Sequence, residues 1–439
     1  MRSRSLSLLF ALLIHAAAAV AQTAADQVRA SAHPLTDYGA LMDAIGDRRF
    51  VLMGEASHGT AEFYRERARI TRQLIEEKQF RAVVLEASWS DVARVDAYIR
   101  GAADRDPLLE FTEFPVWMWR NAEFAAFVRW AREHNRNRQT GEPEIRIFGL
   151  DLYTAFESMD ALVAYLRTID AAAAARAVQR YSCFDAYRAD LSEYARAVRQ
   201  SRERSCQEQA AAVYEELSTR FGEVPADEPA FHAVQHARVV MNAEAFYRAA
   251  ASGRSSWNVR DTHMTETLAA LATHLDASFA PTRFALWAHN THVGDASATD
   301  MASYGDVNIG QLVRQRWPGQ SFHVGFSMYG GAVMAAHTWG GAGEVMALRP
   351  ADPSLVGALF HSAGIGDFYL LTSQVPALAE GRWQRAVGVL YRPLTERQSH
   401  FIWGTPANQY DAMIHIEESH AVTPLTGWLQ SRRRAVRTP

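Results

Sequence analysis

Short apolar runs alternate with longer helical patterns through much of this chain, and this alternation restricts the folds that the chain can adopt. Runs typical of β-strands occur at 49–54, 81–86, 145–150, 283–288, 322–326, 332–336, 368–372 and 387–391. Patterns typical of amphipathic helices separate the early runs, at 60–78, 92–100 and 123–135. The sequence therefore predicts an α/β fold with a mostly parallel central sheet flanked by helices.

The strand pattern stops between residues 158 and 251, where long helical patterns rich in Ala, Arg and Glu take over. We interpret 158–251 as a helical insertion or cap, with a break near 221–229. The α/β domain is then divided into a first part, 22–157, and a second part, 252–430. The arginine-rich end of the chain, 431–439, is expected to be a basic, disordered tail.

The N-terminal segment, 1–21, has the features of a secretory signal peptide. A basic start, Met1-Arg-Ser-Arg-Ser5, precedes an apolar run at 6–20, and Ala19-Val20-Ala21 forms an A-x-A cleavage site. The apolar run is too short to favour a membrane span. We therefore expect an exported, periplasmic protein that starts near Gln22 and has no membrane association after cleavage.

Charge and cysteine content restrict the partners of the mature chain. Cleavage removes Arg2 and Arg4, so the formal net charge changes from −4 to −6, which gives no reason to expect nucleic-acid binding. The two cysteines, Cys183 and Cys206, lie in a helical region and could form a disulfide between neighbouring helices. Neither a C-x-x-C pattern nor a Cys/His zinc spacing is present.

Polar side chains follow five of the predicted strands. In chain order these strand ends carry Glu55 with His58, Glu86 with Trp89, Asp151 with Tyr153, His289-Asn-Thr-His292, and Ser327 with Tyr329. Because the carboxyl ends of parallel strands meet at one edge of a sheet, these side chains should gather there. One polar strand end would be an ordinary loop, but five of them predict a shared functional cleft.

The first of these loops, Gly54-Glu-Ala-Ser-His-Gly59, allows two interpretations. Glu55 and His58 could belong to a helix-capping turn with a surface imidazole. Alternatively, a strand that delivers an acid and an imidazole to a strand-to-helix turn suits proton transfer. The other strand ends favour proton transfer.

Two further segments allow both a structural and a functional interpretation. Trp117 and Trp119 precede a predicted helix, and they could pack in the core or form an apolar wall for a bulky ligand. Asn258 or Asp261 could cap the next helix, whereas Arg260 could direct its guanidinium into the cleft.

Motifs for several other chemistries are absent. No G-x-S-x-G elbow occurs, and 54–59 and 325–330, which come nearest, have the wrong spacing. The chain has no glycine-rich phosphate loop, and its acids and imidazoles lack a strong metal-ligand spacing such as H-E-x-x-H. Water activated by an imidazole remains, with a carboxylate to orient the ring and an arginine or second histidine to stabilise an oxyanion. We expect neither a metal nor a cofactor.

Several sequence blocks resemble the erythromycin esterase family, in the family's order and across most of the mature chain. These blocks are 54–59, 84–89, 114–119, 149–153, 258–261 and 287–295. The resemblance implies an α/β fold with a helical subdomain and metal-independent hydrolysis of a macrolide lactone, and hence macrolide resistance. The implied partner is a small-molecule ester or macrolide.

The resemblance also implies roles for individual residues. By position, His58 matches the family's proposed general base, and the other expected catalytic residues are Glu55, Glu86, His289 and His292. Residues expected to bind substrate, from the resemblance or from their place near the cleft, are Arg67, Trp117, Trp119, Asp151, Tyr153 and Arg260. Glu55 or Glu86 would orient the imidazole. His289, His292 and an arginine would hold the oxyanion or protonate the leaving alkoxide. Spacing alone would place Arg67 on a solvated helix face.

Two departures from the family widen the range of functions. Asp261 is followed by Thr262-His263-Met264, where the family would have a further basic residue. The signal peptide sets the chain apart from cytoplasmic resistance esterases. An exported member could act on another ester, take part in envelope polysaccharide metabolism, bind a ligand without turnover, or be a metallohydrolase.

Overall fold

A computed structural model describes residues 23–111, 115–139, 142–188, 190–253, 255–279 and 281–425 of the chain. The predicted signal peptide, 1–21, and the predicted tail, 431–439, lie outside these ranges. Among the helices in the described ranges, none has both the length and the apolarity needed to cross a bilayer.

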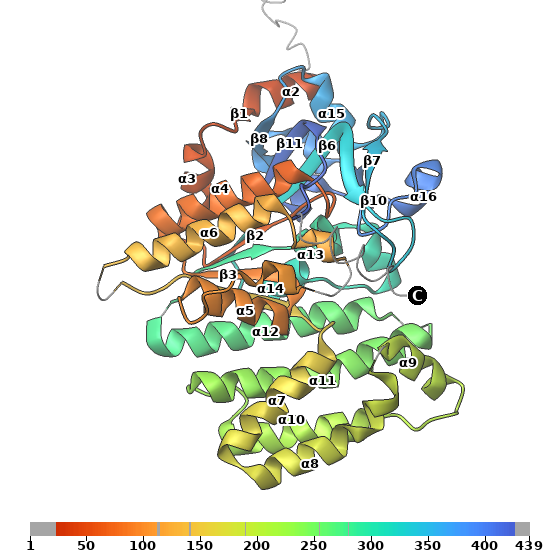
Figure 1. Cartoon of the computed structure of the whole chain (residues 1–439). Helices are drawn as coiled ribbons and strands as arrows, with labels where there is room; N and C mark the ends of the chain where they lie inside the picture. Colours follow the sequence, from red (N-terminus) through yellow and green to blue (C-terminus); the bar gives the residue numbers. More distant parts are fainter. Residues whose placement is uncertain are drawn as a thin grey trace, which may run out of the picture.

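A mostly parallel sheet occupies the centre of the molecule (Figure 1). In the described residues nine strands join in the order β1-β8-β11-β6-β2-β5-β3-β4, with β7 paired to β6. The strands are β1 (His33–Pro34), β2 (Phe50–Met53), β3 (Ala82–Ser88), β4 (Arg146–Asp151), β5 (Phe284–Trp287), β6 (Ser321–Ala335), β7 (Glu344–Leu348), β8 (Phe368–Leu371) and β11 (Ala412–Ser419). The run from β11 to β4 is parallel throughout, which confirms the predicted fold class. A separate antiparallel pair consists of β9 (Arg382–Arg385) and β10 (Phe401–Gly404).

Alternate side chains of the central strands enter two different cores. On β2, Phe50 and Leu52 belong to one core, while Val51 and Met53 belong to the other. Both faces are buried because helices cover both sides, as is usual for parallel sheets. One face packs on α3 (Gly39–Ile45), α4 (Ala61–Lys78) and α6 (Ala122–Asn137), and the other on α12 (Trp257–Phe279), α14 (Ile309–Arg316) and α15 (Val356–Ser362).

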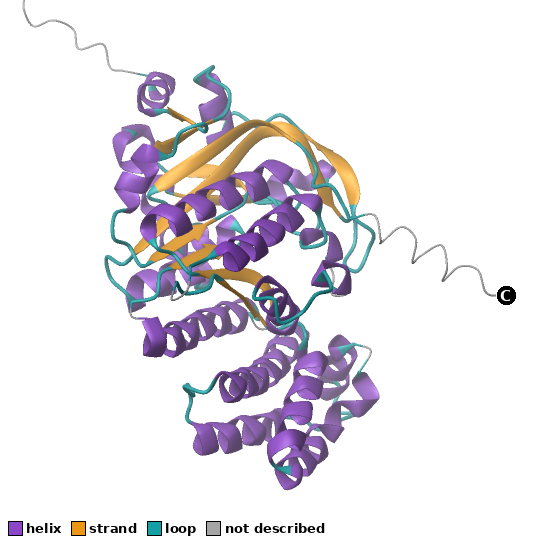
Figure 2. Cartoon of the chain, turned by 60° about the vertical axis from the view of Figure 1, so that its left-hand side comes forward, coloured by secondary structure: helices purple, strands orange, loops and turns teal. Residues whose placement is uncertain are grey.

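Between β4 and β5 the chain is helical. It forms α7 (Ala155–Ile169), α8 (Ala171–Tyr181), α9 (Leu191–Arg199), α10 (Gln207–Phe221) and α11 (Glu228–Ala251) before α12. Figures 1 and 2 show these helices as a lobe below the sheet, with α12 between the lobe and the sheet. Gly222, with a φ of 88°, ends α10 near the predicted break. Within the lobe Cys183 and Cys206 form a disulfide, with their Cα atoms 6.1 Å apart.

The strand β6 is longer than predicted. It runs unbroken from Ser321 to Ala335, whereas the sequence predicts two strands, 322–326 and 332–336. The glycines at 330 and 331 do not end it: Gly331 has a φ of 111°, and a Cβ there would lie 2.2 Å from the carbonyl oxygen of Ser419 on β11. Glycine is therefore required at position 331, where β6 approaches β11 this closely.

The length of β6 changes the fifth predicted strand end. Ser327 and Tyr329 lie inside β6, where the Ser327 hydroxyl is 3.0 Å from Nδ1 of His415 and the Tyr329 ring stacks on His361. The prediction that these two side chains reach a shared cleft is wrong, because the strand does not end at residue 326.

The predicted strand at 387–391 is also wrong. Val387 and Leu390 form only isolated bridges, to Ser57 and Ala336. This segment is therefore a loop that runs beside the loop following β2.

The loop after β2 is held against β6 at Gly59. The carbonyl oxygen of Gly59 accepts hydrogen bonds from the amides of Met334 and Val422, each at 3.0 Å. A Cβ at Gly59 would lie 1.9 Å from the carbonyl oxygen of Met334. Only glycine permits this approach, so the position of the loop is fixed relative to β6.

Candidate active site

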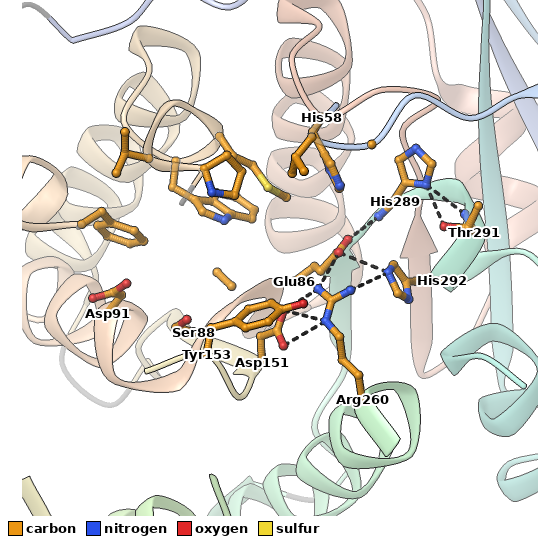
Figure 3. A pocket seen from close by; sticks show the side chains of 18 of the residues that line it. His58, Glu86, Ser88, Asp91, Asp151, Tyr153, Arg260, His289, Thr291 and His292 are labelled. Carbon is orange, nitrogen blue, oxygen red and sulfur yellow. Dashed lines mark hydrogen bonds and ion pairs between the residues drawn. The ribbon is translucent and has the colours of Figure 1, made fainter. Parts of the chain in front are cut away.

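The carboxyl ends of β2, β3, β4 and β5 open into one cavity of about 270 Å³ (Figure 3). Predicted site residues that line it are His58, Glu86, Trp119, Asp151, Tyr153, Arg260, His289 and His292. Four of the five predicted strand ends therefore meet in one place. Other residues of the wall include Pro115, Val116, Met118, Ala386, Gly388, Val389 and Trp339.

The buried carboxylate of Glu55 holds the His58 ring, and the buried guanidinium of Arg67 in turn holds Glu55. Its Nδ1 lies 2.8 Å from Oε1 of Glu55, and Oε2 of Glu55 accepts a hydrogen bond from Nη2 of Arg67 at 2.7 Å. The Arg67 guanidinium also lies over the rings of Tyr64 and Trp287, 4.6 and 5.0 Å from their centroids. A carboxylate on Nδ1 selects the tautomer whose lone pair is on Nε2. Nε2 of His58 is therefore the nitrogen available to a water molecule in the cavity.

Only one of the two acids that were expected to orient the His58 ring does so. Glu55, not Glu86, orients the imidazole. Arg67 is fully buried and does not line the cavity, so the expectation that it binds substrate is not met. Arg67 is also not on the solvated helix face that its spacing suggests. It acts through Glu55 as a positioning residue.

His289 supplies a neutral ring beside His58. It precedes α13 (Asn290–Val293), and its Nδ1 accepts the Thr291 amide at 3.3 Å while its own amide donates to Oε2 of Glu86 at 2.7 Å. Burial, strengthened by the nearby His58, holds the pKa of His289 well below its ordinary value. An accepting Nδ1 assigns the proton to Nε2. The ring centroids of His58 and His289 are 4.9 Å apart, so the two imidazoles are neighbours.

Arg260 joins two acids on the opposite wall of the cavity. Its Nε lies 3.1 Å from both oxygens of Asp151, its Nη2 donates to Oε1 of Glu86 at 2.8 Å, and its Cζ lies 5.2 Å from the Tyr153 ring centroid. Burial disfavours the charge of Arg260, yet Asp151, Tyr153 and Glu86 together outweigh burial and raise its pKa. Burial likewise opposes ionisation of Glu86, but His292 and Arg260 hold the pKa of Glu86 well below its usual range. Both groups are therefore charged.

His292 is the second imidazole bonded to carboxylates, and its charge differs from that of His289. Its Nδ1 lies 2.9 Å from Oδ1 of Asp261, its Nε2 lies 3.2 Å from Oε1 of Glu86, and its ring stacks on Trp257 at 4.4 Å. Burial lowers the pKa of His292, but Asp261 and Glu86 overcome it and raise the pKa to about 9. His292 is thus an imidazolium at neutral pH. Its Nε2 is 3.0 Å from Nη1 of Arg260, a contact between two cations that share the Glu86 carboxylate.

The apolar part of the cavity contains only one of the two predicted tryptophans. Trp119 lines it together with Phe111, Val116, Met118 and Val389. Trp117 points elsewhere and packs on Gly343, where a Cβ would lie 2.4 Å from Cδ1 of the indole. The prediction that Trp117 forms part of the ligand wall is therefore wrong.

Sequence reasoning missed three residues of this region. Asp261 is predicted only as a helix cap, yet it is fully buried and bonded to His292. Trp257, four positions earlier on the same helix, stacks on that ring. Asp91 lies in the first turn of α5 (Trp89–Ile99) and lines the cavity, although nothing in the sequence marks it. A signal was present for Asp261, because it adjoins Arg260.

The acids of the cavity are already engaged by cations or imidazoles. Within the part of the chain that the structure describes, no three His, Cys, Asp or Glu side chains are arranged to hold a metal ion. The arrangement instead combines an imidazole bonded to a carboxylate, a second, neutral imidazole and two fixed cations. Such a set suits the addition of water to a carbonyl carbon.

The family follows from a comparison with known sequences. A family model for erythromycin esterase matches residues 75–419. The chain belongs to the erythromycin esterase family. The range that matches the family includes Glu86, Asp151, Arg260, His289 and His292. It begins after Glu55, His58 and Arg67, so these three rest on the geometry of the site.

Solved structures share the fold of this family member at low sequence identity. A succinoglycan biosynthesis protein is 17% identical, with a TM-score of 0.74, over 92% of this chain and 98% of that one. A Bacillus cereus protein is 18% identical, with a TM-score of 0.77, over 92% and 98%. A mutant of the erythromycin esterase EreC in its open conformation is 17% identical, with a TM-score of 0.65, over 88% and 95%. At these identities the likeness shows the fold alone.

Proposed function

We propose that this protein is a carboxylic ester hydrolase that opens a macrolide lactone by adding water, without a metal. The observation that carries the proposal is the His58 centre. Its imidazole lines the cavity, with Nδ1 bonded to the buried Glu55 carboxylate and Nε2 left for water. Membership of the erythromycin esterase family supports ester hydrolysis as the reaction class.

In the first step, Nε2 of His58 removes a proton from water, and the oxygen attacks the carbonyl carbon of the ester. Glu55 stabilises the resulting imidazolium through the Nδ1 hydrogen bond. The oxyanion of the tetrahedral intermediate accepts the Nε2 proton of His289 in a hydrogen bond and lies in the field of Arg260 and His292. Donors of this kind contribute about 10²–10³-fold to kcat each.

In the second step, the bond between the carbonyl carbon and the ring oxygen breaks. The leaving alkoxide takes the proton from His58, which returns the imidazole to its neutral form. The product is an opened chain that ends in a carboxylate, and the proton of the new acid passes to solvent. One water is consumed for each ester cleaved.

The cavity favours a bulky, largely apolar ester over a polysaccharide. Its volume of about 270 Å³ lies just below the range of about 300–1,000 Å³ that is usual for drug-sized ligands. The part of the substrate that carries the ester therefore enters, while the rest lies at the mouth, where Trp339 is 65% exposed. Trp119 and Val389 offer apolar contacts to the part of the substrate that enters.

The test is incubation of the purified protein with 14-membered macrolides and with simple aryl esters, before and after dialysis against a chelator. Ring opening adds the mass of one water, which mass spectrometry detects. Cleavage of aryl esters without cleavage of macrolides would remove the macrolide from the proposal. Cleavage of neither, or loss of activity with the chelator, would remove the metal-independent hydrolase.

We also propose that hydrolysis takes place outside the cytoplasm, because the N-terminal segment has the pattern of a signal peptide. Fractionation of cells that express the full chain should place activity in the periplasm. N-terminal sequencing of that fraction should begin near Gln22.

A further inference from the structure

One carboxylate that the proposed mechanism does not use lines the same cavity. Asp91 is 2% exposed and belongs to the first turn of α5. In Figure 3, Asp91 and Ser88 lie on the side away from His289 and His292, with Tyr153 between the two groups. A substrate whose ester lies at His58 therefore meets Asp91 with a different part of the molecule.

Arg94 compensates the charge of Asp91 only in part. Its Nη2 donates to Oδ1 of Asp91, and its Nε also lies 3.7 Å from Oε2 of Glu110, so one guanidinium serves two acids. A carboxylate has two acceptor oxygens, and Oδ2 can accept a further donor. Burial raises the pKa of Asp91 to about 6 although Arg94 opposes it, and Glu157 adds to the rise. Arg94 therefore does not fully offset the cost of burying the ionised carboxylate.

The charges of the side chains that line the cavity lead to the same conclusion about Asp91. Among the described residues that line it, the acids Glu86, Asp91 and Asp151 face the cations Arg260 and His292. Glu86 and Asp151 are bonded directly to Arg260. Asp91 is thus the acid of the lining whose cation, Arg94, does not itself line the cavity.

We propose that Asp91 binds a protonated amine of the substrate, on the side of the molecule away from the scissile ester, and thereby determines specificity. An ammonium N–H would donate to Oδ2. The alkyl groups of a secondary or tertiary amine would contact the rings of Phe111 and Trp119, which line the same cavity and attract cations through their faces. The inference rests on the proposed function, because it assigns a second anchor to the same substrate.

The test uses pairs of 4-nitrophenyl esters that differ in one atom. Each pair consists of an acyl chain ending in a dimethylammonium group and its isostere ending in an isopropyl group, at several chain lengths and at pH 8. At the best length we expect the wild-type protein to favour the ammonium ester by about tenfold in kcat/KM, mostly through KM. Asp91→Asn should abolish this preference and change kcat/KM for the neutral ester by less than about threefold.

Asp104→Asn is the matched control, because Asp104 is an exposed acid that pairs with Arg132 at 3.3 Å and does not line the cavity. It should keep the full preference. If Asp91→Asn keeps the preference, or if it lowers kcat/KM equally for both esters, Asp91 is not an amine anchor. A preference in the wild-type protein for hydroxyl-bearing esters over both members of the pair would also overturn the proposal.

A binding measurement separates this inference from the proposed function. Dimethylamino amides of the same chain lengths replace the ester by an amide, and calorimetry gives the highest affinity in the series. Weakening of about tenfold in Asp91→Asn would support the anchor even if no ester is cleaved. Equal binding by both proteins would refute the anchor even if esters are cleaved.

Discussion

Two imidazoles, at His58 and His292, share one cavity and the same kind of support, but they differ in their second partner. Each presents Nδ1 to a buried carboxylate, that of Glu55 or that of Asp261. Behind His58 the carboxylate is shared with the buried Arg67 guanidinium. His292 instead has a second carboxylate, that of Glu86, 3.2 Å from its Nε2.

The difference shows that the second partner decides what a histidine can do. A single carboxylate that is already neutralised fixes a tautomer and leaves Nε2 free to accept a proton. Two carboxylates raise the pKa of His292 to about 9 and convert it into a permanent donor and cation. In the proposed mechanism the same residue type thus serves as base on one wall and as anion stabiliser on the other.

The largest effect should come from His58→Asn, which removes the base and keeps a polar side chain of similar size. We expect kcat/KM for any cleaved ester to fall by about 10³-fold, within the range for loss of a general base. Steady-state kinetics measures it. His33→Asn is the control, because His33 stacks on Tyr369 at the sheet edge and should keep full activity. Intact hydrolysis in His58→Asn would mean that His292, and not His58, acts as the base.

The next largest effect concerns the free energy of unfolding as a function of pH. The folded protein keeps a proton on His292 up to about pH 9, whereas an unfolded histidine releases it near its ordinary pKa of about 6.5. The His292 contribution is therefore complete below pH 6.5 and is lost as the pH rises through 9. From these values it amounts to about 3 kcal/mol.

Urea unfolding between pH 6 and pH 10 measures this slope. Asp261→Asn removes one of the two carboxylates and should flatten the decline, because His292 then titrates closer to the unfolded state. Asp160→Asn, at a surface acid bonded to Arg188, should leave the slope unchanged. Parallel curves for all three proteins would show that Asp261 does not hold the proton on His292.

The smallest effect should come from removing the cation that neutralises the carboxylate beside His58, because the carboxylate would then act on the ring as those beside His292 do. Arg67→Gln leaves the Glu55 carboxylate without its cation, so the protonated form of the ring gains stability. We expect about a tenfold lower rate at pH 7, with the acidic limb of the kcat profile moved to higher pH. Arg67→Lys should restore part of the rate. A uniform loss at every pH would instead indicate that Arg67 only supports packing.

Part of the fold is visible in the sequence because burial leaves a regular pattern. The strands β2 to β5 are apolar runs between helices, and they were predicted within two residues of their observed ends. The strand β11 carries polar residues in its interior and was missed. His415 on β11 is fully buried, and burial lowers its pKa to about 4, so it is accommodated as a neutral partner of Ser327.

The candidate site was predictable where a side chain stands at a strand end. Glu86, Asp151, His289 and His292 follow directly from the parallel topology. Trp117 and Trp119 could not be told apart, because they lie at and just after the turn Val116–Met118, which sends the two rings in different directions. Asp261 and Asp91 lie on helices, where the sequence fixes a face but not which neighbour that face meets.

Gly59 links the position of the His58 loop to the shape of the cavity mouth. It ties the His58 loop to Met334 on β6, and β6 continues into the turn that carries Trp339 at the mouth. A mutation that widened the mouth by remodelling this turn would displace the base as well. The segment that carries Met118 and Trp119 is tied to the same parts of the molecule, because Trp117 packs on Gly343 of that turn and the Tyr64 hydroxyl donates to the carbonyl oxygens of both His58 and Met118. A change in the size of the mouth would therefore move both walls.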